Sequence, residues 1–242
     1  MDHTTITLQT AYGPMDALQD RTRRRGPTPG SPGDPGSVQS NHHIRNVCQR
    51  LTAHGYVALA PELFHCTGQG VELGYTDMSQ VMPHFSKLTN SGILMDIEAG
   101  LASLTDDPRV DPARIGVIGF CARAGSRPSW LPSARMRKRS SSSMAAGSLR
   151  ARPGIALEPI IGDADRIHQP VLLMFEVDRI ESIPAADIQE IDETLTRLGK
   201  PHLTVTMPDG GHGFACDERA AYHAPSNDEA WRITYEWLEG NL

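Results

Sequence analysis

A cysteine near the middle of the chain has the surroundings of a catalytic nucleophile. Cys121 directly follows the apolar run 115–120, which ends in Gly119-Phe120 and predicts a buried strand with a sharp turn after it. A nucleophile at such a turn can attack a carbonyl carbon, while the N–H of the next residue, Ala122, faces the developing oxyanion. A cysteine in this role acts as a thiolate and needs a base nearby. A structural cysteine at a strand end is the competing interpretation.

His212 is the candidate base. It lies in the glycine-flanked run 209–214, on a loop that follows a predicted strand at 202–207. A histidine on a loop after a late strand suits a nucleophile held at the end of an earlier strand, because both project from one edge of a parallel sheet. Taken by itself, His212 is also compatible with an ordinary turn.

A carboxylate is expected to orient this histidine. Asp178 is favoured because it is the aspartate that follows the predicted strand 171–175, and Glu176 and Glu181 are close alternatives. The chain order would then be nucleophile, acid, histidine, as in enzymes that carry their nucleophile on a strand-to-helix turn. Each of these carboxylates is also compatible with a solvated turn.

Two pairs of neighbouring residues contain metal-ligand types, His42-His43 and His65-Cys66. Neighbours in a strand or helix point in different directions, and no second pair stands at a suitable spacing in the sequence. We therefore expect no metal site, and no cofactor is implied.

The elements that position these residues alternate between strands and helices. Strands are expected at 5–9, 56–60, 114–120, 171–175 and 202–207; helices are expected around 44–51, 93–104 and 188–198 and from Ser226 onward. This alternation predicts an α/β fold, with a mostly parallel sheet covered by helices on both faces. We expect one domain over residues 1–242.

Two segments break this pattern. Residues 18–40 combine four arginines with interleaved prolines and glycines, which is typical of a disordered linker. Residues 122–153 contain seven arginines and Lys138, no acidic residue, and the serine run 140–143. We expect both segments to disrupt the fold.

Charge and cysteine spacing limit the classes of partner. The net charge of −6 argues against nucleic acid, and a reading of 135–143 as a nucleic-acid-binding arm lacks interleaved aromatic residues for stacking. The four cysteines have no CxxC spacing, which fits a reducing cytoplasm. No apolar run suggests a signal peptide or a membrane span, so we expect a cytoplasmic protein without a membrane partner.

Three stretches carry a family resemblance. The runs HIRNVC at 43–48, GYVALAPELF at 55–64 and GHGF at 211–214 resemble the dienelactone hydrolase (carboxymethylenebutenolidase) family. The resemblance implies an α/β-hydrolase fold and a Cys-His-Asp triad that opens a lactone or ester through a thioester acyl-enzyme. Cys121, His212 and Asp178 match the triad, and Ala122 matches the oxyanion donor.

The chain departs from the family pattern at several positions. The family has glycines where this chain has Arg123 and Ala124, and its activating glutamate has no counterpart in residues 18–40. Cys216 stands near the expected position of a substrate-binding arginine of relatives, so the resemblance does not fix the substrate. An inactive family member with no enzymatic role is therefore the alternative to a working hydrolase.

A shifted reading frame would explain both odd segments. Residues 34–38 can be encoded by GAT CCA GGA AGC GTT, which one base later reads Ile-Gln-Glu-Ala-Phe, the family's glutamate segment. Residues 141–146 can be encoded by TCG TCG TCT ATG GCG GC, which one base earlier, with a G in front, reads Val-Val-Val-Tyr-Gly-Gly, a good buried strand. We hypothesise that both segments are translated out of frame, and sequencing of the gene would sink this idea if its codons do not give these peptides.

Overall fold

The computed structural model describes residues 2–21, 28–34, 42–68, 70–71, 73, 78–120, 143–145, 164–176 and 184–242. Within these residues, nine strands form one sheet. The strands are β1 (Asp2–Thr10), β2 (Gly13–Arg21), β3 (Thr28–Asp34), β4 (Val57–Pro61), β5 (Val110–Ile115), β6 (Val117–Gly119), β7 (Ser143–Ala145), β8 (Val171–Glu176) and β9 (His202–Met207). The helices are α1 (His42–Ala53), the short 3₁₀ helix η1 (His65–Thr67), α2 (Met78–Phe85), α3 (Asn90–Asp106), α4 (Ala185–Arg197) and α5 (Ala224–Asn241).

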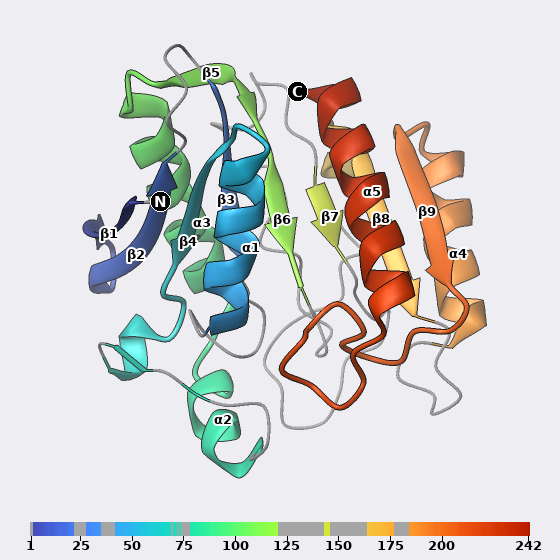
Figure 1. Cartoon of the computed structure of the whole chain (residues 1–242), viewed down its shortest axis with the longest axis horizontal. Coiled ribbons are helices and arrows are strands. Elements are labelled where there is room, and N and C mark those ends of the chain that lie inside the picture. The colour runs from blue at the N-terminus through green and yellow to red at the C-terminus, as the bar shows by residue number, and fades with distance from the viewer. Residues whose placement is uncertain are drawn as a thin grey trace.

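The sheet is mostly parallel, as the alternation of elements predicts. Its order is β1-β2-β4-β3-β6-β7-β8-β9, and β5 pairs with β3 outside this path (Figure 1). β1 pairs antiparallel with β2, and β2 pairs antiparallel with β4. From β4 through β3 to β9 every neighbouring pair on this path is parallel. The carboxyl ends of these parallel strands therefore lie along one edge of the sheet.

Helices cover both faces of this sheet, which confirms the predicted layering. Residues of one strand alternate between the faces, so Val57 and Leu59 of β4 pack in the same cluster as the apolar residues of α3 and α4. Ala58 and Ala60, which lie between them, pack with α1 and α5 instead. α1 and α5 lie in front of the sheet in Figure 1. All five residues of β4 are buried, which explains its nearly continuous apolar sequence.

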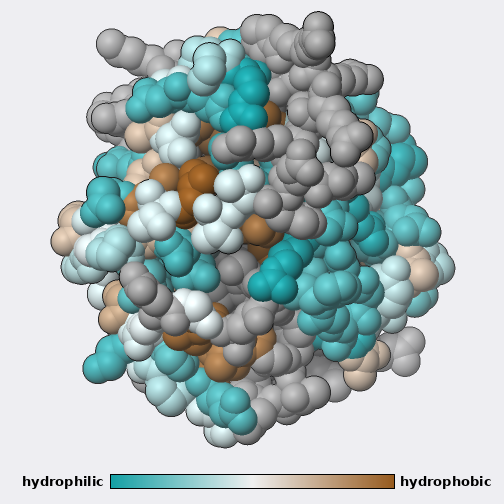
Figure 2. All heavy atoms as spheres, turned by 60° about the vertical axis from the view of Figure 1, so that its left-hand side comes forward, coloured by the Kyte–Doolittle hydropathy of each residue, from teal (hydrophilic) through white to brown (hydrophobic). Residues whose placement is uncertain are grey.

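The described residues on the face drawn in Figure 2 are largely hydrophilic. Figure 2 shows hydrophilic side chains over much of one face, with hydrophobic ones in small separate groups. Large exposed hydrophobic side chains in the described part of the chain are Tyr12, Met82, Met95 and Leu203. No helix among the described residues is both long and apolar enough to cross a membrane.

The expected disruption of residues 18–40 and 122–153 is not confirmed, because the structure describes parts of both segments as strands of the sheet. β2 continues to Arg21, β3 occupies 28–34 between β4 and β6, and β7 occupies 143–145 between β6 and β8. The physical reason is that the neighbouring strands offer backbone hydrogen-bond partners, and strand pairing needs only the backbone of the inserted segment. The other residues of the two segments lie outside the described ranges, and the frame hypothesis remains a prediction about the gene.

Two predicted boundaries also differ from the structure. The last helix begins at Ala224, before Ser226, because Pro225 is already fixed near a helical φ in the first turn. The Ser226 hydroxyl lies 2.8 Å from Nδ1 of His223, the residue that precedes the helix. The strand expected at 114–120 is divided into β5 and β6 at Gly116.

Candidate active site

The end of β6, Glu176 and His212 lie at the carboxyl edge of the parallel strands. β6 ends at Gly119 and Phe120 follows it, β8 ends at Glu176, and His212 lies on the loop after β9. Cys121 and Ala122, which come next after Phe120, lie outside the described residues, as do Asp178 and Glu181. Ligands and reactants of open α/β sheets bind at this edge, because several loops meet there.

His212 is held by a buried carboxylate. Its Nδ1 lies 2.7 Å from Oε1 of Glu176, a distance at which the ring N–H donates a hydrogen bond to the carboxylate. The side chain of Glu176 is 5% exposed and that of His212 is 15% exposed. When Nδ1 carries the proton, the neutral imidazole has its lone pair on Nε2, and His212 can accept a proton there. This arrangement is the one that a general base requires.

The loop that carries His212 is fixed by a buried aromatic side chain. Phe214 packs with Leu172 and Met174 of β8 in a small hydrophobic cluster. Its backbone N–H donates to the carbonyl of Gly211 at 2.9 Å. The residue between His212 and Phe214, Gly213, has a φ of +90°, a conformation that favours glycine. The sequence around His212 therefore sets the direction in which this loop leaves the sheet.

Replacing Phe214 with alanine is expected to destabilise the fold by about 3–5 kcal/mol, because a buried aromatic side chain is lost and a cavity remains. Phe214→Leu is the matched variant; it keeps most of the volume and should cost clearly less. Urea unfolding monitored by circular dichroism measures both free energies. Equal losses in the two variants would show that the ring does not pack as described.

Two cysteines that the structure describes, Cys48 and Cys66, are poorly suited to act as a nucleophile. Burial raises the pKa of the Cys48 thiol to about 12, and Asp20 adds to this effect. Burial also raises the pKa of Cys66, with a further contribution from Asp96. A thiol with a raised pKa supplies little thiolate at neutral pH, so neither residue is a suitable nucleophile.

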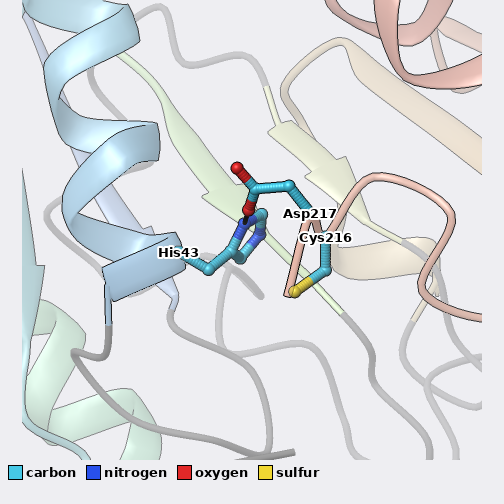
Figure 3. A group of neighbouring side chains, drawn as sticks. All are labelled: His43, Cys216 and Asp217. Atoms are coloured by element: carbon cyan, nitrogen blue, oxygen red, sulfur yellow. Dashed lines mark ion pairs between the residues drawn. The ribbon is translucent and has the colours of Figure 1, made fainter. Parts of the chain in front are cut away.

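A second polar cluster joins α1 to the His212 loop (Figure 3). Nδ1 of His43 lies 3.6 Å from Oδ1 of Asp217, and the ligand atoms of His43, Cys216 and Asp217 all lie within 4.8 Å of one another. Burial lowers the pKa of His43, and Asp217 partly opposes that shift. The sequence gives no sign of this cluster, since His43 is far from the other two residues along the chain.

The structure bears on the open choice of the acid. The sequence favours Asp178 over Glu176, but the carboxylate found beside His212 is that of Glu176. β8 continues one residue beyond the predicted strand, so that Glu176 lies at its carboxyl end. A strand prediction extended by this one residue would have favoured Glu176. Asp178 lies outside the described residues, and its role remains a prediction.

Solved structures with a similar fold share this architecture. A dienelactone hydrolase-type protein from Klebsiella pneumoniae subsp. pneumoniae superposes with a TM-score of 0.85 at 22% identity, over 98% of each chain. The acylaminoacyl peptidase of Pyrococcus horikoshii gives a TM-score of 0.76 at 13% identity, over 100% of this chain and 42% of the peptidase. The fold is that of an α/β-hydrolase.

The sequence comparisons narrow this class to a family. The model of the dienelactone hydrolase family matches residues 36–242. A Synechocystis sp. protein assigned as a carboxymethylenebutenolidase is 35% identical over 208 residues, which is 84% of this chain and 82% of the relative. A Methylorubrum extorquens protein with the same assignment is 30% identical over 212 residues, 82% of this chain and 67% of the relative. The chain belongs to the dienelactone hydrolase family, as the resemblance implies.

Proposed function

We propose that this protein opens small lactones or esters, with Cys121 as nucleophile, His212 as general base and Glu176 as the carboxylate that orients His212. The observation that carries the proposal is the 2.7 Å contact between Glu176 and His212 at the carboxyl edge of the sheet. Cys121 follows Phe120 at the end of β6, and β6 and β8 are separated by β7 alone. The relatives' assignment as carboxymethylenebutenolidases supports a lactone as the substrate class.

The reaction has two stages. Nε2 of His212 takes the thiol proton of Cys121, and the sulfur forms a bond to the carbonyl carbon while its oxygen becomes an oxyanion near the N–H of Ala122. The bond from that carbon to the ring oxygen then breaks, and the leaving oxygen receives the proton from His212. In the second stage His212 removes a proton from water, which attacks the thioester. The bond from the carbonyl carbon to the sulfur of Cys121 then breaks, the thiolate takes the proton back from His212, and the product acid leaves.

The test is turnover by the purified full chain, with p-nitrophenyl acetate and a dienelactone as substrates. Intact-mass spectrometry after rapid acid quench should detect an acyl adduct, and peptide mapping should place it on Cys121. Turnover with an acyl group on another residue would contradict the assignment of the nucleophile. A chain that unfolds cooperatively but turns over neither substrate would contradict the function itself.

An inactive family member is the second candidate, and one feature of the sequence favours it. Arg123 and Ala124 stand where the family has two glycines, directly after the residues that form the nucleophile turn. The double variant Arg123→Gly with Ala124→Gly separates the two candidates. A chain that gains hydrolytic activity only with these glycines is held inactive by the two side chains.

A further inference from the structure

The cluster of His43, Cys216 and Asp217 brings together three kinds of metal ligand from two distant parts of the chain. His43 lies in the first turn of α1, and the other two residues lie on the loop between β9 and α5 (Figure 3). His43 is 7% exposed and Cys216 is 6% exposed, whereas Asp217 lies at the surface. The site is thus enclosed on the side of the core and open on the side of the carboxylate.

The spacing fits ligands that share an ion. The 3.6 Å between Nδ1 of His43 and Oδ1 of Asp217 is longer than an ordinary hydrogen bond. Two ligands at zinc-bond lengths of about 2.1 Å in a tetrahedral site are about 3.4 Å apart. Cys216 binds a metal ion as a thiolate and so completes a ligand set of imidazole, thiolate and carboxylate. This set suits Zn²⁺ better than hard cations such as Mg²⁺ or Ca²⁺.

The surrounding contacts hold the ligands in place. The N–H of Cys216 donates to the carbonyl of Gly213 at 2.9 Å, so the loop turns tightly just before its two ligand residues. His43, the ligand on α1, is held by Phe120, whose ring packs edge-on against the imidazole at 5.8 Å between centroids. The loop has a second link to α1, since Nδ1 of His42 lies 2.9 Å from Oε1 of Glu218.

We propose that His43, Cys216 and Asp217 bind one Zn²⁺ ion, with water as the fourth ligand. The ion ties the loop that carries His212 to the first turn of α1, beside the residue that precedes Cys121. Its role is to hold this loop in position, and it takes no part in the acyl transfer. The proposal goes beyond the hydrolase function and does not depend on it.

The test is Co²⁺ and Zn²⁺ titration of the full chain carrying Cys121→Ser, so that the proposed nucleophile cannot supply the thiolate. We expect one Co²⁺ per chain, a thiolate-to-cobalt charge-transfer band, and loss of this band when Zn²⁺ is added. Cys216→Ser should abolish the band, and His43→Gln should weaken binding by at least about tenfold. Asp217→Asn, a change at the surface, should weaken binding without affecting the fold.

Two matched variants serve as controls. His42→Gln replaces the neighbouring histidine that pairs with Glu218, and Cys66→Ser replaces an exposed thiol on η1; both should bind Co²⁺ like the parent. The proposal is overturned if the parent binds no stoichiometric metal, if the band survives in Cys216→Ser, or if Cys66→Ser removes it. Circular dichroism of each variant is the check on folding. Should Cys216→Ser not fold, unchanged metal binding by Asp217→Asn overturns the proposal.

Discussion

Replacing Cys121 with alanine is expected to lower kcat for p-nitrophenyl acetate by at least about 10⁴-fold, because loss of a nucleophile removes the covalent route altogether. The residual rate should approach that of the oxyanion donor and the binding site alone. Steady-state kinetics on purified variants measure the loss, and an unchanged melting temperature shows that the fold is retained.

The matched control is Cys66→Ser, which removes an exposed thiol from another part of the molecule. This variant should keep the parent's activity, because burial and Asp96 raise the pKa of Cys66 and leave it mostly protonated. Hydrolysis that survives in Cys121→Ala but disappears in Cys66→Ser would show that Cys66, and not Cys121, is the nucleophile.

Glu176→Gln is expected to lower kcat by about 10³–10⁴-fold. The amide has nearly the shape of the carboxylate, but it cannot stabilise the imidazolium that forms when His212 takes a proton. Its NH₂ group can also donate to Nδ1, which would leave the proton on Nε2 and block the base. KM should change much less than kcat, since Glu176 acts through His212 and does not itself touch the substrate.

Asp178→Asn decides between the two acids. If Glu176 orients His212, this variant should retain activity within about threefold, whereas a loss as large as that of Glu176→Gln would return the role to Asp178. Glu190→Gln on the exposed surface of α4 controls for the general loss of a negative charge. Activity that is unaffected by both Glu176→Gln and Asp178→Asn would refute a carboxylate partner among them.

The parts of the fold that the sequence predicts are those with a local cause. β4, β8 and α3 follow from runs or periods of apolar residues, which report directly on burial. β3 could not be predicted, because its residues resemble a linker and its place in the sheet depends on β4 and β6. The same limit applies to the site: the glycine-flanked His212 stands out locally, but its partner is set by strand register.

The cluster around His43 illustrates a second limit. Metal-ligand patterns in sequence are recognised by short spacings, and His42-His43 has no such partner nearby. Its neighbours in space come from the loop between β9 and α5, which is far from α1 along the chain. The ligand set therefore depends on tertiary structure and leaves no local trace.

The order of the parallel strands has a consequence for synthesis on the ribosome. Among the parallel strands of the main path, β3 emerges first and β4 joins one side of it. β6, β7, β8 and β9 are then added in turn on the other side. Until β9 and α5 have emerged, β8 is the open edge of the growing sheet, although all six of its residues are buried in the finished protein. Exposed apolar edges of this kind favour aggregation. A nascent chain stalled before residue 202 would therefore expose the open edge of β8, which β9 and α5 cover in the finished protein.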